Sequence, residues 1–189
     1  EYSMPIASAQ VKSAILLAGL QAEGVTIIEE PQNSRNHTEL MIKGFGGEVG
    51  LDGRHVSVQG GQTLHGKDVR IPGDISSAAF FLVAAALIPE SQIVVRRVGV
   101  NPTRDGVIEI LRRMGAEIEL LDATIETGEP VADLKVTGKR LKGVEIGSGF
   151  AATRLRGDIA ATLRKGGVKP FNISSERYQA GAEGSPPIR

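Results

Sequence analysis

The sequence contains no cysteine and no tryptophan, and aromatic residues make up only 4% of it. The absence of cysteine excludes disulfide bonds and thiolate metal sites. The longest apolar run, Ala78–Ile88, is too short to span a bilayer, and no signal-peptide pattern is present. Neither sign of charge predominates, because 22 basic side chains balance 22 acidic ones. This balance argues against nucleic acid or a membrane surface as a partner.

Glycine is abundant instead, at 24 of 189 residues. Such a composition suits an α/β protein with closely packed helices and many turns. The length allows one domain or two small ones. Because the chain opens on Glu1 rather than methionine, we expect it to be a piece of a longer protein.

The stretch from Met4 to Leu20 predicts a helix with a polar first turn. Ser8 has the chemistry of an N-cap. A buried face is predicted for the apolar residues at helical spacing, Val11, Ile15, Leu16 and Leu20. Ser8, Gln10 and Lys12 crowd the first turn, where free amides and the helix dipole favour an anion. Lys12 is expected to face solvent, and the pattern alone leaves open whether this is a capped core helix or a binding site.

Further elements follow from the same patterns. A second helix is predicted from about Thr38 to Phe45, with Leu40, Met41 and Phe45 facing the core. Short strands are predicted at Val25–Ile28, Glu48–Leu51, His55–Gln59 and Ile93–Val98.

The two halves of the chain repeat one plan. Pro5 and Pro72 each precede a predicted helix, and Val56–Gly60 corresponds to Leu134–Gly138. The correspondence widens at Asp122–Ala132, which we interpret as a loop inserted in a hairpin. A recurring order of helix, strand, helix and strand pair indicates duplicated α/β units, each with helices on one side of a small sheet.

Four segments, in order, resemble the 5-enolpyruvylshikimate-3-phosphate (EPSP) synthase family. They are ASAQVKSAILLAGL at 7–20, SRNHTELMIKGFG at 34–46, IPGDISSAAFFLVAAAL at 71–87, and NPTRDG with RRMGAEIE within 101–119. Four ordered matches are far more specific than one short motif. The resemblance covers residues 2–145 and is predicted to stop after Ile146, where two motifs typical of the family have no counterpart.

This resemblance implies a fold and a division into domains. The fold is α/β (α+β), with repeated βαβαββ-type units in the inverse α/β barrel-like arrangement of enolpyruvyl transferases. Residues 1–62 resemble the last unit of one domain and residues 67–146 the first unit of the other, with the substrate cleft between them. Residues 147–189 are expected to be a poorly ordered tail, either divergent or translated in a shifted frame.

The resemblance also implies a reaction. Enolpyruvyl transferases of this family move the enolpyruvyl group of phosphoenolpyruvate to the 5-hydroxyl of shikimate 3-phosphate and release phosphate, without a metal or organic cofactor. The implied enzyme is a cytoplasmic transferase of aromatic amino-acid biosynthesis, monomeric at full length. This chain would hold only part of the site, so we expect it to be inactive alone.

Five residues match substrate-binding positions of the family. Ser8, Ala9 and Gln10 match positions that bind shikimate 3-phosphate, and Gln10 also lies beside phosphoenolpyruvate. Ser34 matches a phosphate-binding serine, and Arg35 stands where a basic side chain lies near that phosphate. A hydroxyl and a guanidinium together suit a phosphate group. No catalytic residue and no metal ligand can be assigned.

Other polar residues have structural interpretations. Asp74 is predicted to cap the helix at Ser76, and Arg104 to belong to a turn. His37 either bonds substrate or packs as a polar side chain, and the pattern does not decide between these. The glycine cluster at Gly44–Gly50 lacks the spacing of the dinucleotide fingerprint.

Three rival interpretations remain. UDP-N-acetylglucosamine enolpyruvyl transferases share the repeat plan, but they lack the SAQVKSA wording and carry a reactive cysteine that this chain does not have. A nucleic-acid-binding or RNA-end-processing module would need a basic face, which the balanced charge does not support. The chain could also be a non-catalytic remnant that folds.

Overall fold

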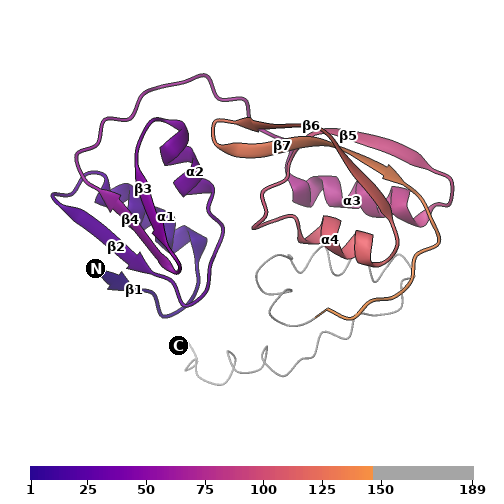
Figure 1. The fold of residues 1–189 in the computed structure, drawn as a ribbon, viewed down its shortest axis with the longest axis horizontal. Coiled ribbons are helices and arrows are strands. Elements are labelled where there is room, and N and C mark those ends of the chain that lie inside the picture. The colour runs from indigo at the N-terminus through magenta and orange to yellow at the C-terminus, as the bar shows by residue number, and fades with distance from the viewer. Residues whose placement is uncertain (147–189) are drawn as a thin grey trace, which may run out of the picture. The chain divides into compact units, whose positions relative to one another are not determined.

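Figure 1 shows the computed structural model, which describes residues 1–146. Its contacts divide the chain into two compact units. The first consists of Glu1–Gly73, Arg96–Thr103 and Leu121–Asp133, and the second of Asp74–Val95, Arg104–Leu120 and, within the described part, residues 134–146. The domain boundaries at residues 62 and 67 stay predictions, and the tail predicted from residue 147 lies outside the described residues.

The first 62 residues contain two helices and a four-stranded sheet. In chain order they are β1 (Tyr2–Ser3), α1 (Ala9–Gly19), β2 (Val25–Glu29), α2 (His37–Gly44), β3 (Val49–Asp52) and β4 (His55–Gln59). The strand order is β1-β2-β4-β3, with β1 parallel to β2 and the other pairs antiparallel. The strands predicted in this stretch are confirmed to within one or two residues.

The second stretch repeats the same plan. It contains α3 (Ile75–Leu87), β5 (Gln92–Gly99), α4 (Gly106–Arg113), β6 (Glu117–Glu126) and β7 (Glu129–Thr137), in a sheet of order β5-β7-β6. A parallel bridge between Gly73 and Val98 corresponds to the pairing of β1 with β2. The predicted α/β class and the succession of elements are therefore confirmed.

The segment Asp122–Ala132 does not form a loop, so that prediction is wrong. β6 and β7 run through it and leave only Thr127 and Gly128 between them. Both residues have positive φ, 49° and 88°, as a two-residue hairpin turn of type I′ requires. The extra residues lengthen two paired strands instead of forming a loop.

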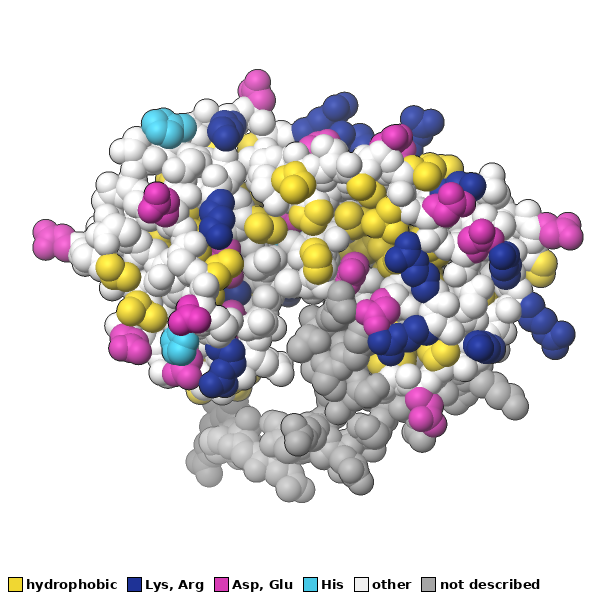
Figure 2. Space-filling view, viewed as in Figure 1, with side chains coloured by type: hydrophobic (Ala, Val, Ile, Leu, Met, Phe, Trp, Pro, Cys, Tyr) yellow, Lys and Arg dark blue, Asp and Glu magenta, His cyan; other side chains and the backbone are white. Residues whose placement is uncertain are grey.

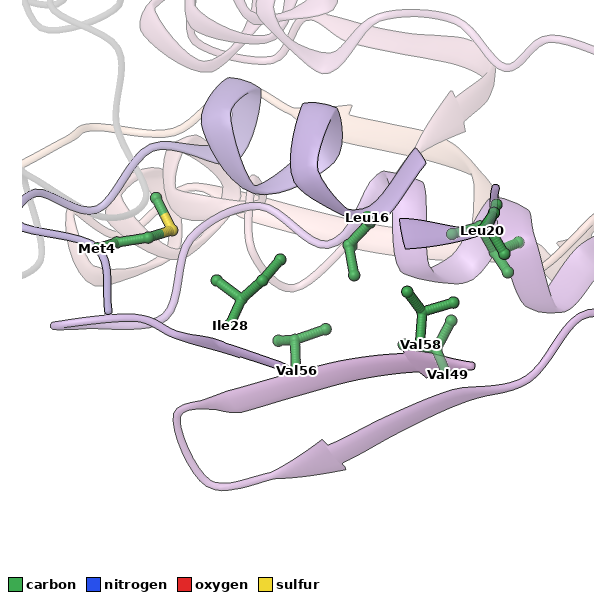
Figure 3. Close-up of a cluster of buried hydrophobic side chains, with 8 residues drawn as sticks. Met4, Leu16, Leu20, Ile28, Val49, Val56 and Val58 are labelled. Carbon is green, nitrogen blue, oxygen red and sulfur yellow. The ribbon is translucent and has the colours of Figure 1, made fainter. Parts of the chain in front are cut away.

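Helix α1 packs on the first sheet through its later turns (Figure 3). The cluster comprises Met4, Leu16, Leu20, Ile28, Ile42, Val49, Val56 and Val58, with Ile15 packed against it. Burial of such side chains supplies most of the stabilisation of a small unit. Val11, predicted to belong to this face, is 43% exposed, so the apolar contact begins a turn later than expected.

The inward face of α2 was predicted incorrectly. Met41 is 50% exposed, whereas Ile42 and Glu39 are buried. Leu40 and Phe45 are only partly buried. Glu39 is buried where its apolar neighbours were expected to be, because Lys12 of α1 pairs with it.

Candidate functional site

The first turn of α1 presents three predicted site residues at the surface. Ser8 is the N-cap, with extended φ and ψ of −146° and 110°, and its Oγ accepts a hydrogen bond from the Val11 amide at 3.4 Å. The same hydroxyl lies 3.3 Å from Gln10 Oε1, to which it donates. Ser8 and Ala9 are partly exposed and Gln10 is exposed. The turn therefore keeps its polar groups accessible, with the positive end of the helix dipole behind them.

Lys12 does not face solvent, so that prediction is wrong. Its side chain is 1% exposed, and its Nζ lies 2.9 Å from Glu30 Oε2 and 2.7 Å from Glu39 Oε1. Glu30 follows β2 and Glu39 lies in the first turn of α2. One buried ammonium thus joins α1 to two segments that come later in the chain.

Ser34 is joined to this group through the second oxygen of Glu30. Its amide and its hydroxyl donate to Glu30 Oε1, at 3.3 and 2.5 Å. Ser34 is therefore connected to the first turn of α1 by hydrogen bonds through Glu30 and Lys12. Arg35 is partly buried and makes no ion pair with any residue of the described part.

His37 packs among polar side chains. Its Nδ1 lies 2.6 Å from Glu129 Oε1 on β7, and Asn101 donates to Glu129 Oε2 at 3.1 Å and to Asn36 Oδ1 at 2.9 Å. His37 Nε2 is buried and has no hydrogen-bond partner among residues 1–146. Polar packing thus accounts for Nδ1, and a bond from Nε2 to substrate stays a prediction.

Sequence reasoning missed Glu30, Glu39, Asn101 and Glu129. No local pattern could have found them, because each acquires its role from a partner distant in the sequence. What the sequence did show was position: Glu39 and Asn101 lie within segments that resemble the family, and Glu30 lies four residues before Ser34. Within residues 1–146, no three His, Asp or Glu side chains gather in a way that would hold a metal ion.

Asp74 caps α3, as predicted. It accepts from the amide and hydroxyl of Ser77 at 3.1 and 3.2 Å, and Arg104 bonds both Asp74 and Ser76. Burial raises the pKa of Asp74, but the amides of Ser76 and Ser77 and the charge of Arg104 outweigh it and hold the pKa below its usual value. Arg104 thus braces a helix start and belongs to the structure of the second unit.

No helix in the described part of the chain is both long and apolar enough to cross a membrane.

Comparison with known proteins places the chain among enolpyruvyl transferases. The family model of EPSP synthase (3-phosphoshikimate 1-carboxyvinyltransferase) matches residues 1–165. This is further than Ile146, where the resemblance was predicted to stop. The 3-phosphoshikimate 1-carboxyvinyltransferases of Bacillus pumilus and Geobacillus kaustophilus are 52% identical over 158 residues and 57% identical over 146 residues.

These alignments cover 84% and 77% of this chain but 37% and 34% of the two relatives. The chain therefore spans about a third of the length of the curated relatives it matches.

Solved structures agree with the sequence relatives. An EPSP synthase from Acinetobacter baumannii is 44% identical, with a TM-score of 0.76 over 88% of this chain and 36% of that one. A second structure from the same organism is 42% identical, with the same TM-score over 97% and 44%. The enolpyruvyl transferase NikO from Streptomyces tendae is 18% identical, with a TM-score of 0.58 over 80% and 35%, and shares the fold. The chain belongs to the EPSP synthase (3-phosphoshikimate 1-carboxyvinyltransferase) family.

Proposed function

We propose that this chain is part of an enzyme that transfers the enolpyruvyl group of phosphoenolpyruvate to the 5-hydroxyl of shikimate 3-phosphate and releases phosphate. Membership of the family supports the reaction. Because the chain spans about a third of its relatives, the role proposed for it is narrower, namely binding of shikimate 3-phosphate. Turnover by the chain alone is not expected.

The setting of this enzyme is part of the proposal. The reaction belongs to the shikimate pathway, which leads to aromatic amino acids, and we place the full-length enzyme in the cytoplasm as a monomer. Phosphoenolpyruvate is its second substrate, with Gln10 beside it. These statements rest on the family resemblance.

One observation carries the proposal: the accessible turn at Ser8–Gln10 and the serine at Ser34 are linked through Lys12 and Glu30. A phosphate monoester needs several donors converging from different directions. Free amides at the start of α1, the Gln10 amide and the guanidinium of Arg35 are suitable donors.

Ser34 has one hydroxyl proton, and in this structure it points to Glu30. A carboxylate only accepts hydrogen bonds, so the serine must be the donor at 2.5 Å. To bind a phosphate oxygen, the hydroxyl would turn away from Glu30, while the Ser34 amide keeps its own bond to the same carboxylate. The amide bond to Glu30 therefore keeps Ser34 in place when its hydroxyl turns to a ligand.

Calorimetric titration with shikimate 3-phosphate tests the proposal. We expect saturable binding, weakened about tenfold or more by Gln10→Ala because a hydrogen bond to a polar ligand is lost. Gln21→Ala is the matched control, since Gln21 is also exposed but lies beyond the other end of α1. Equal effects of the two substitutions would contradict the assignment of Gln10.

The same titration separates the rivals. Saturable binding of UDP-N-acetylglucosamine in place of shikimate 3-phosphate would support the other enolpyruvyl transferase. Binding of neither compound would support a remnant that only folds. Sustained phosphate release from the two substrates would contradict the expectation that the chain is inactive alone.

A further inference from the structure

Three charged side chains are buried together. They come from the first turn of α1, from the segment after β2, and from the first turn of α2. Lys12 is 1% exposed, and Glu30 and Glu39 are each 2% exposed. Lys12 follows one turn after Ser8, whose carbonyl accepts the Lys12 amide at 3.0 Å. A second link, between Ser13 Oγ and Thr38 Oγ1 at 2.6 Å, joins the same two helices.

Core stability does not explain this choice of residues. Removing charges from water is costly, and apolar side chains of similar volume usually stabilise a core as well as a buried ion pair does. Burial of two carboxylates against one ammonium is less favourable still. A buried group of this kind is therefore expected to specify a geometry.

The geometry it specifies is that of Ser34. Glu30 divides its oxygens, with Oε2 bonded to Lys12 and Oε1 bonded to the amide and hydroxyl of Ser34. The carboxylate can reach Ser34 in only one orientation while Lys12 holds its other oxygen. Glu39 contacts Lys12 through Oε1, and its Oε2 has no hydrogen-bond partner among residues 1–146, so Glu39 holds nothing outside the group.

We propose that Glu30, anchored by Lys12, is a positioning residue that fixes Ser34 relative to the first turn of α1. The inference deepens the proposed function and rests on it for the ligand, shikimate 3-phosphate. Sites whose supporting side chains are locked by further bonds hold their ligands with less loss of freedom. Glu30 would act on the ligand through Ser34, without touching it.

The decisive variant is Glu30→Gln. A glutamine keeps one acceptor oxygen and replaces the other with a donor, which cannot face both Lys12 Nζ and the donors of Ser34. Glu39→Gln is the matched control, because it removes the same charge from the same buried group and leaves the Glu30 bonds to Ser34 in place. Thermal unfolding of each variant establishes that it is folded.

The first measurement needs no ligand. Hydrogen exchange of the Ser34 amide, followed by NMR, should be at least tenfold faster in Glu30→Gln than in Glu39→Gln, after correction for any change in global stability. Equal exchange in the two variants would overturn the inference, even if the chain binds no shikimate 3-phosphate. Failure to bind that compound would count against the proposed function instead.

The second measurement is a double-mutant cycle on the affinity for shikimate 3-phosphate. Glu30→Gln should weaken binding about tenfold in the parent chain and cause no further loss in a Ser34→Ala background. Equal losses in both backgrounds would mean that Glu30 acts on structure in general, and would overturn the inference.

A second construction covers the case in which Glu30→Gln does not fold. Lys12→Met, Glu30→Leu and Glu39→Leu together replace the charged group with an apolar one, which should fold. The triple variant should bind as weakly as Ser34→Ala alone. Parental affinity in this variant would overturn the inference.

Discussion

At the scale of single residues, the carboxylate of Asp74 makes stability depend on pH. Burial raises its pKa, but the amides of Ser76 and Ser77 and the charge of Arg104 together outweigh burial, so the pKa is lowered in the folded chain. A group whose folded pKa lies below its unfolded value stabilises the fold at pH above the unfolded value. That contribution is lost as the pH falls from near the ordinary aspartate value of 3.8 through the folded pKa.

Asp74→Asn tests this dependence, because asparagine still caps a helix but carries no charge. We expect the parent chain to lose more stability than the variant as the pH is lowered from 5 to 2. The difference should stay below about 1 kcal/mol, since the Asp74 side chain is 45% exposed and solvent screens the pair with Arg104. Denaturant unfolding at several pH values measures it, with Asp68→Asn at an exposed position as the control.

Residue-level predictions from sequence succeeded where local chemistry decides. The caps Ser8 and Asp74 could be predicted because an N-cap bonds an amide two or three residues away. The burial of Lys12 and Glu39 could not be predicted, because a charged side chain is buried in a core only when it is paired there. Each is the other's ion-pair partner, and the sequence does not show that the two positions are adjacent in the fold. The binding roles of Ser8, Gln10 and Ser34 stay predictions.

At the scale of elements, each repeat has a glycine just after a strand, where the backbone passes close to the end of the first helix of that repeat. Gly60 follows β4, and a Cβ there would lie 1.8 Å from the carbonyl oxygen of Ala22. Gly138 follows β7, and a Cβ there would lie 1.8 Å from the carbonyl oxygen of Ile88. Both carbonyls lie just beyond the end of a helix, α1 in one case and α3 in the other. The repeat thus preserves a close approach of backbones as well as the order of elements.

Alanine at these positions should be costly. We expect Gly60→Ala and Gly138→Ala each to lower the free energy of unfolding by about 1–3 kcal/mol, because the backbone must move to admit the methyl group. Gly66→Ala is the control, since Gly66 has open space around it and no positive φ. Thermal or urea unfolding measures the three variants. Equal stability of all three would show that the approach relaxes without cost.

Element order could be predicted from hydrophobic period and turn residues, but the lengths of β6 and β7 could not. Residues 120–125 are exposed, so the alternation that marks a half-buried strand is missing there. Pairing across the hairpin and the ion pair of Arg97 with Glu126 at 2.6 Å stabilise this part instead. Contacts between different strands cannot be predicted from the sequence of one segment alone.

At the scale of the whole molecule, large apolar side chains are exposed on α1 and on α3, the first helix of each repeat. Leu17 of α1 is 54% exposed, and Phe80 and Phe81 of α3 are 51% and 65% exposed. Figure 2 shows further hydrophobic side chains exposed in several places on the drawn face. Apolar surface of this extent on a small chain favours association.

We therefore expect the chain to self-associate as its concentration rises, and the double variant Leu17→Lys with Phe81→Lys to reduce this association. Both side chains are more than half exposed, so little core packing is lost and the variant should remain folded. Gln21→Lys is the control for added charge, because it places a lysine at an exposed position that is already polar. Sedimentation velocity across a hundredfold range of concentration measures the mass distribution of each. A parent chain that stays monomeric over this range would contradict the prediction. An equal effect of Gln21→Lys would mean that added charge, rather than the loss of apolar surface, is what reduces association.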